Sequence, residues 1–143
     1  MDVIDFLKSE HQIAKAAFAE ILEAAPAKRG SLWAALEPEL KAHEEFEEAN
    51  LYGPLEKDGV ADPVLSEWVS DRHGEEVDEV EALIEETRRL DPMEERWLAT
   101  MQKIHTALED HIRQEEGSIF PRITQAWDRV AGERTGGRRP EKR

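Results

Sequence analysis

The sequence predicts an all-α protein: an antiparallel up-down four-helix bundle with a short C-terminal helix. Strong helix formers dominate the composition, and runs of β-branched and aromatic residues are absent. Four segments carry apolar residues at three-to-four spacing, as amphipathic helices do. Short turns separate these segments, so consecutive helices should lie antiparallel. The 143 residues fit one domain, with the bundle expected over 1–131 and a basic, disordered tail over 132–143.

The first helix is expected from about Asp2 to Ala24. Its apolar stripe comprises Val3, Phe6, Leu7, Ile13 or Ala14, Ala17, Phe18, Ile21 and Leu22. His11 falls within this stripe. The segment Pro26–Gly30 is the expected first turn, and Ser31 the expected N-cap of the next helix.

The second helix is expected to follow Ser31 and to close at Gly53-Pro54. Its stripe comprises Leu32, Leu36, Leu40, His43, Glu47 and Leu51. Pro38 lies inside this pattern and removes one backbone donor. Because the stripe continues in phase across the proline, we expect a kink and not the start of a new helix.

Asp62-Pro63 and Asp91-Pro92 each resemble a cap followed by proline at the first helical position. The third stripe comprises Leu65, Val69, His73, Val77, Val80 and Ile84. The fourth comprises Trp97 or Leu98, Met101, Ile104, Leu108, His111 or Ile112, and Glu115. A short helix over Pro121–Ala131 should pack Ile123 and Trp127 against the bundle end.

Two segments repeat one pattern: HEEFEEANLYGP, from His43 to Pro54, and HIRQEEGSIFP, from His111 to Pro121. In each, a glutamate stands four residues after the histidine. Four residues advance a helix by about 400°, so the imidazole and the carboxylate share one face and can hold a metal ion between them. One such pair is common by chance in a glutamate-rich chain, whereas two copies with matching flanks are not.

Each long helix carries one histidine on its stripe: His11, His43, His73 and His111. With Lys28, Asp58 and Asp91 as turn centres, histidines on consecutive helices are equally far from their shared turn to within two residues. That mismatch is at most about 3 Å of helical rise. The sequence therefore predicts four imidazoles, with Glu47 and Glu115, in one layer of the core.

The alternative to a shared site is four separate core histidines, since a buried histidine usually has one hydrogen-bonded partner of its own. Six polar groups in one core layer would each cost about a few kcal/mol if unpaired. Buried carboxylates such as Glu47 and Glu115 are rarely retained without a partner. A metal cluster would remove all of these costs together.

Glu76, three residues after His73, could reach the same centre or belong to a solvated acidic run, and both readings stay open. Glu48 and Glu116 point about 140° away from their histidines and are expected to face either a neighbouring helix edge or water. A further possible role for both is to accept imidazole N–H groups.

His105 lies about 120° off the face of His111 and is expected at the surface. Tyr52 and Phe120 are expected to close one end of the bundle, with a hydrogen-bonding or redox role for Tyr52 as the lesser alternative.

Together, His11, HEEFE, His73 and HIRQE followed by EEGSIFP resemble the hemerythrin-like HHE cation-binding family, from about Val3 to Ile123. The resemblance implies a four-helix bundle with two iron ions, bridged by two carboxylates and an oxo or hydroxo group. By position, the implied ligands are His11, His43, Glu47, His73, His111 and Glu115, with Glu47 and Glu115 as the bridges.

The chain departs from the oxygen-carrying members of that family at two positions. Those members have a second histidine four residues after the third-helix histidine, where this chain has Val77. They also have an aspartate five residues after the last histidine, where this chain has Glu116. The chain is thus nearer the carboxylate-richer branch than the reversible oxygen carriers.

Imidazole and carboxylate ligands without sulfur suit iron, and manganese or zinc less well. An octahedral pair keeps one open position if Glu76 binds and two if it does not. A small diatomic molecule or peroxide could bind there, whereas a narrow bundle should leave little room for an organic substrate.

Three functions stay open. The first is a di-iron protein that binds or reacts with O2, peroxide or nitric oxide, for redox, oxygen or iron sensing or for detoxification. Whether it is an enzyme is undecided by the sequence. The second is a non-enzymatic iron-binding sensor or storage module, and the third a metal-free helical interaction domain.

The formal net charge of −14 would repel a nucleic-acid backbone. The absence of cysteine excludes disulfides, thiolate metal sites and thiol nucleophiles. The N-terminal segment lacks a basic region followed by an apolar run, and no apolar stretch approaches the ~20 residues that span a bilayer. We therefore expect a cytoplasmic protein without nucleic-acid or membrane partners, and no sequence feature indicates its oligomeric state.

Overall fold

The computed structural model describes residues 2–135, and the side chains of residues 2–128. Every element in that range is helical, which confirms the predicted all-α class. The helices are α1 (Val3–Glu23), α2 (Pro26–Glu47), α3 (Gly53–Asp58), α4 (Pro63–Glu67), α5 (His73–Thr87), α6 (Glu95–Gln114) and α7 (Phe120–Thr135). Three π-helical turns, η1 (Glu48–Tyr52), η2 (Trp68–Arg72) and η3 (Glu115–Ile119), connect α2 to α3, α4 to α5 and α6 to α7.

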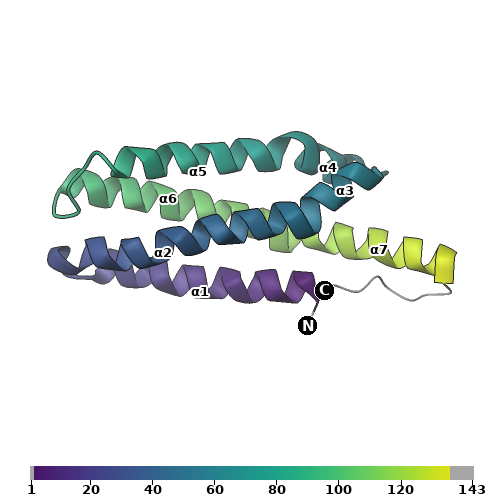
Figure 1. The fold of residues 1–143 in the computed structure, drawn as a ribbon, viewed down its shortest axis with the longest axis horizontal. Coiled ribbons are helices and arrows are strands. Elements are labelled where there is room, and N and C mark those ends of the chain that lie inside the picture. Colours follow the sequence, from purple (N-terminus) through teal and green to yellow (C-terminus); the bar gives the residue numbers. More distant parts are fainter. Residues whose placement is uncertain (1, 136–143) are drawn as a thin grey trace.

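Four long helices form the predicted up-down bundle (Figure 1). The α1–α2 and α5–α6 connections lie at one end, and α3, α4 and α7 lie at the other. The most extensive packing is within the pairs α1/α2 and α5/α6. At the start of α7, Ile123 is fully buried and Trp127 packs partly buried beside it, as predicted.

Two apolar clusters fill the bundle, one toward each end. The cluster at the α7 end includes Leu7, Tyr52, Leu65, Trp68 and Phe120, and the cluster at the α1–α2 turn end includes Phe18, Trp33, Trp97, Met101 and Ile104. Along α1, His11 lies between the two clusters. A polar layer in the middle of the bundle is thus shielded by apolar side chains on both sides.

The second helix starts earlier than the sequence indicated. It begins at Pro26, and Ser31 lies inside it, where its hydroxyl donates to the backbone oxygen of Lys28 at 3.2 Å. Proline lacks a backbone N–H, but the N–H at the first position of a helix has no partner within the helix. A proline there therefore costs no hydrogen bond. Gly30 marks a close contact and not a turn, since a Cβ there would lie 3.2 Å from Cγ of Pro92. The helix continues through Pro38, as expected.

The π-helical turns were not predicted, although two of them have a visible cause. In η1 the N–H of Gly53 donates to the oxygen of Glu48, and in η3 the N–H of Phe120 donates to the oxygen of Glu115. The next residue is a proline in each case. A proline ring clashes with the carbonyl four residues earlier, and a widened turn relieves this clash.

The expected boundary between bundle and tail falls within α7. Residues 132–135 continue this helix, and the remainder of the expected basic tail, 136–143, lies outside the described residues. None of the described helices has the length and apolar character needed to cross a membrane.

Candidate metal centre

The four stripe histidines meet in one layer of the bundle, as the counting from the turns predicted. His11 comes from α1, His43 from α2, His73 from the start of α5 and His111 from α6. The ring centroids of His11 and His43 are 5.0 Å apart, and those of His73 and His111 are 5.2 Å apart. His43 is partly buried and the other three are buried.

Glu47 lies between two imidazoles and turns a different oxygen toward each. Its Oε2 is 3.2 Å from Nε2 of His43, and its Oε1 is 3.2 Å from Nε2 of His73. Its exposed fraction is 0%. One carboxylate at the end of α2 therefore contacts histidines of α2 and α5.

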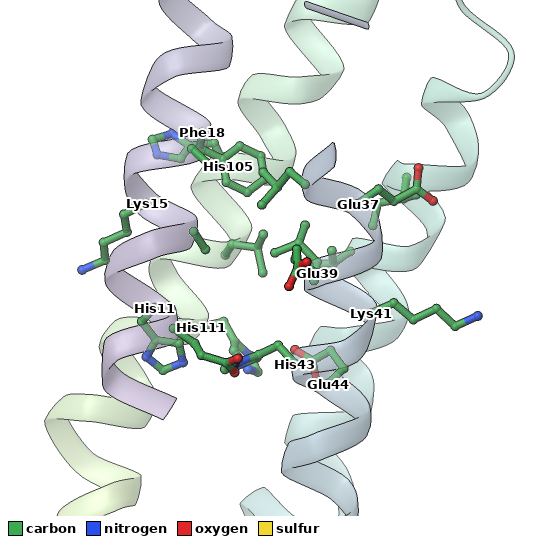
Figure 2. A pocket seen from close by; sticks show the side chains of 18 of the residues that line it. His11, Lys15, Phe18, Glu37, Glu39, Lys41, His43, Glu44, His105 and His111 are labelled. Carbon is green, nitrogen blue, oxygen red and sulfur yellow. Dashed lines mark hydrogen bonds and ion pairs between the residues drawn. The ribbon is translucent and has the colours of Figure 1, made fainter. Parts of the chain in front are cut away.

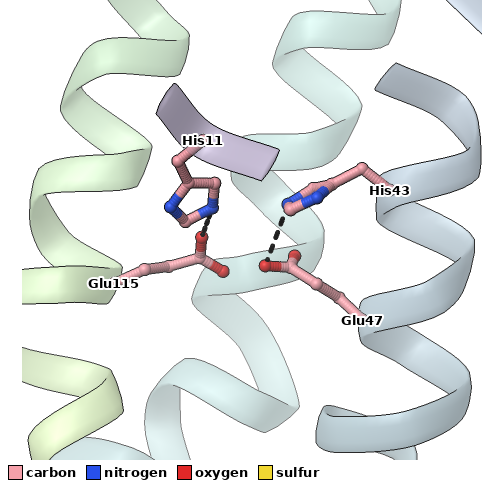
Figure 3. Close-up of side chains that lie close together, drawn as sticks. All are labelled: His11, His43, Glu47 and Glu115. Carbon is pink, nitrogen blue, oxygen red and sulfur yellow. Dashed lines mark ion pairs between the residues drawn. The ribbon is translucent and has the colours of Figure 1, made fainter. Parts of the chain in front are cut away.

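Glu115 repeats this arrangement from the opposite side of the layer (Figure 3). Its Oε1 is 3.2 Å from Nε2 of His11, and its Oε2 is 3.4 Å from Nε2 of His111. The hydroxyl of Tyr52 donates to the same Oε2 at 2.7 Å. Glu115 is also 0% exposed, so both carboxylates are fully enclosed.

Two groups of possible ligand atoms result, each with its atoms within 4.8 Å of one another. The first group is His11, His43, Glu47 and Glu115, and the second is Glu44, Glu47, His73 and His111. Glu47 belongs to both, and Glu115 places its other oxygen beside the second group. Two carboxylates that each span two donor groups suit a pair of cations.

The outer nitrogens of three histidines are held by carboxylates. The contacts are His11 Nδ1 to Glu116 Oε2 at 2.6 Å, His43 Nδ1 to Glu10 Oε1 at 2.8 Å, and His111 Nδ1 to Glu76 Oε1 at 2.8 Å. An imidazole that donates its Nδ1–H outward turns an unprotonated Nε2 toward the centre. Such pairs fix the tautomer and ring orientation of metal-binding histidines.

These contacts confirm Glu116 as an acceptor. Glu48 is exposed, and Glu10 of α1 is the acceptor for His43 in its place. No sequence spacing could reveal Glu10, because it lies 33 residues before its partner on a neighbouring helix.

Glu76 faces the outer side of His111 and belongs to neither donor group. Its Oε2 accepts from Gln114 at 2.8 Å and from Arg72 at 3.3 Å. Of the two readings left open by the sequence, this position favours neither direct ligation nor free solvation. Glu76 instead supports an imidazole from behind.

Glu44 is the candidate ligand that the sequence interpretation missed. Its Oε2 lies 3.4 Å from Nε2 of His73, within the second donor group. Glu44 precedes Glu47 by three residues, a spacing that places two side chains on one helix face. The signal for Glu44 is therefore present in HEEFE, as the spacing of three between its first and last glutamates.

Unpaired buried atoms show that the centre suits a cation. Seven buried side-chain atoms among the described residues have no hydrogen-bond partner, and five of them are His11 Nε2, His111 Nε2, Glu44 Oε2, Glu47 Oε2 and Glu115 Oε1. All five belong to residues of the two donor groups. A buried polar atom without a partner is costly, and a bound cation would provide a partner for all of them.

The electrostatics of the centre also favour a cation. Burial would lower the pKa of His43 and of His73, but neighbouring carboxylates, Glu47 for the first and Glu44 and Glu47 for the second, raise each to about 9. Burial and the charge of Glu115 raise the pKa of Glu47 to about 7. Burial would also raise the pKa of Glu115, but contacts with the histidines hold it well below its usual range. Without a metal, protons must therefore compensate the buried carboxylates.

The metal-free protein is expected to lose thermal stability as the pH rises from about 6 to about 9. The pKa of His43 and His73 rises on folding from 6.5 to about 9, so their stabilisation is complete below 6.5 and is lost as the pH passes 9. Glu47 acts in the same direction through about pH 7. The metal-loaded protein should show the opposite trend, because ligands must lose protons to bind. Melting curves with and without chelator measure both trends, and parallel trends would contradict this account.

Three further side chains test the sequence interpretation. Tyr52 and Phe120 are buried in the cluster at the α7 end, as predicted, and Tyr52 is also a hydrogen-bond donor to Glu115. His105 is partly exposed, at 23%: its Nε2 lies 3.5 Å from Oε2 of Glu109, while its ring packs 5.4 Å from that of Phe18.

Comparison with known families agrees with the geometry of the centre. The model of the hemerythrin HHE cation-binding domain matches residues 2–123, which include every residue of both donor groups. No curated protein and no solved structure matches the chain. A match over most of the sequence, with its histidines and glutamates gathered in one buried layer, shows that the chain belongs to the hemerythrin family of HHE cation-binding domains.

Proposed function

We propose that this protein holds two iron ions and binds or reacts with O2, peroxide or nitric oxide, in redox, oxygen or iron sensing or in detoxification. One observation carries the proposal. Each of the two fully buried carboxylates, Glu47 and Glu115, turns one oxygen toward each of two histidine pairs. A site for a single ion needs no such pair of spanning carboxylates.

The residues divide naturally between the two ions. His11 and His43 would hold one ion, and His73 and His111 the other, with Glu47 and Glu115 shared between them. Glu44 lies on the side of the second ion. Imidazole and carboxylate donors favour iron, with manganese or zinc less suited. When bound, an iron pair supplies redox chemistry and an open position for a small ligand.

The chain itself controls water and protons at this centre. The two apolar clusters limit the access of bulk water, which tunes the reactivity of a metal. The Tyr52 hydroxyl holds its proton against Oε2 of Glu115. Burial and the charge of Glu115 keep the pKa of Tyr52 well above its usual value, so the phenol stays protonated. The Tyr52 hydroxyl is thus a permanent hydrogen-bond donor to Glu115.

Purified protein is expected to contain about two iron ions per chain and to show visible absorption. After anaerobic loading with ferrous iron, addition of peroxide should change this spectrum and consume peroxide. Elemental analysis, absorption spectroscopy and a peroxide assay make the three measurements. Loading with at most one ion, or an unchanged spectrum with full peroxide recovery, would contradict the proposal.

A non-enzymatic iron sensor is the second candidate, favoured by a separate observation. The donors come from α1, α2, α5 and α6, so a metal pair would tie all four long helices together. Loss of metal should then lower the stability of the whole bundle. A protein that binds two irons, is inert to peroxide and loses structure on chelation would support this candidate instead.

A further inference from the structure

A cavity of about 650 Å³ adjoins the metal centre. It lies between α1, α2, α5 and α6, and extends from the histidine layer to the level of Phe18 and His105 (Figure 2). The seven residues from His11 to Phe18 on α1 correspond to about 10 Å of helical rise. The expectation that the bundle leaves little room for an organic substrate is therefore wrong.

The cavity is open because small residues line it where larger ones would fill the bundle. Its lining includes Ala14 and Ala17 of α1 and Ala35 of α2. Protein interiors are otherwise packed with few voids larger than a water molecule. A volume of about 650 Å³ falls within the usual range for small-molecule pockets.

The walls between the two ends are apolar, which makes water a poor occupant. They include Leu36 and Leu40 of α2, Val80 and Ile84 of α5, and Leu108 of α6. Ordered water needs two to four polar partners, roughly, and such walls provide few. An apolar molecule gains free energy from the surface that it covers there.

The charges around the cavity exclude an anionic occupant. Ten glutamates line the cavity or its rim, against two lysines and one arginine. Lys15 and Lys41 extend away from the cavity (Figure 2). Arg88 is already paired with Glu37 and Glu85. Because acidic side chains outnumber basic ones in this lining, it disfavours a carboxylate or phosphate and tolerates or attracts a neutral or positively charged group.

One end of the cavity reaches the donor groups. His11, His43, Glu44 and His111 line it there, together with Val77 one turn after His73. Val77 is apolar and offers no ligand atom, so on the cavity side of the histidine layer α5 provides no metal ligand beyond His73. A molecule in the cavity would thus lie beside the ions and not behind another side chain.

We propose that this cavity binds a neutral or positively charged organic molecule with an apolar body of about 10 Å, one end of which faces the metal centre. The inference that a ligand binds in the cavity depends only on the shape, apolar walls and charges of the cavity. The placement beside two ions rests on the proposed function.

Three ligands with the same alkyl chain of about eight carbons, which spans roughly 10 Å, test the proposal. They are n-octanol, n-octylammonium and octanoate, titrated calorimetrically into the metal-free protein, so that octanoate gains no affinity by coordinating a metal. The alcohol and the ammonium ion should bind, and octanoate should bind at least about tenfold more weakly. Equal affinity for all three ligands, or preference for octanoate, would overturn the inference.

Ala17→Phe fills the cavity, and Ala16→Phe is its matched control. Ala16 is the next residue of α1, is exposed and does not line the cavity. Octanol affinity should fall at least about tenfold in Ala17→Phe and stay unchanged in Ala16→Phe. If melting curves show that Ala17→Phe does not fold, Ala14→Phe takes its place. Equal binding by filled and control variants would place the ligand elsewhere and overturn the proposal.

Iron analysis and the visible spectrum separate this inference from the proposed function. Octanol binding should perturb the metal absorption bands, and unperturbed bands would contradict placement beside the ions. Two irons without any ligand binding would overturn the cavity inference alone. Ligand binding that is sensitive to Ala17→Phe, in protein that binds no metal, would support the cavity and overturn the proposed function.

Discussion

Glu115→Gln is expected to reduce the iron content from about two ions per chain to one or fewer. An amide cannot bridge two cations as a carboxylate does, because it is neutral and has a single oxygen. The substitution preserves shape and leaves an acceptor for the Tyr52 hydroxyl, which lies 2.7 Å from Oε2. The effect on metal binding should therefore exceed any effect on folding. Elemental analysis of the variant, with circular dichroism to verify its helices, measures the change.

Glu116→Gln is the matched control, one residue further along η3. Glu116 touches Nδ1 of His11, on the side away from the donor group. This variant should keep two irons and bind them about 10–100-fold more weakly, as expected when the partner of a ligating histidine is weakened. Identical iron content and affinity in both variants would show that Glu115 is not a shared ligand.

The bundle and its histidine layer were predictable from the sequence because helical rise is regular. Apolar stripes fix which face of each helix is buried, and the lengths of the turns fix the levels that meet. His43 and His73 are each 15 residues from Asp58, and the structure brings both to Glu47. Local spacing was likewise enough to place Glu47 and Glu115 beside the histidines of their own helices.

Features that depend on how neighbouring helices pack were not predictable in this way. Glu10 and Glu76 hold histidines of other helices, 33 and 35 residues away in sequence. The cavity depends on the separation of four helices, which the stripes do not determine. Two of the three π-helical turns, η1 and η3, depend on how the backbone relaxes ahead of a proline. Gly30 was misread because a close contact with Pro92 has the same local signature as a turn.

Gly53→Ala is expected to destabilise the protein by about 2–3 kcal/mol, the range of an overpacked interior. A Cβ at position 53 would lie 2.5 Å from the backbone oxygen of Glu48, and 3.1 Å from its Oε2. A side chain could move away, but this backbone oxygen accepts the hydrogen bond that closes η1. The clash can therefore be relieved only by distorting the turn. Chemical denaturation of metal-free protein measures the loss.

Because η1 follows Glu47 directly, the same distortion should weaken iron binding as well as folding. Gly74→Ala provides the comparison, since a Cβ there would meet nothing within 4 Å. Gly74 is the second residue of α5, and η2 continues the helical backbone before it. This replacement should stabilise the protein by about 0.5–1 kcal/mol, because alanine loses less backbone entropy than glycine in a helix. If Gly53→Ala were equally harmless, η1 would be a relaxed, adaptable turn. The position of Glu47 would then depend on the metal and its histidines, and not on the backbone geometry that the proline imposes.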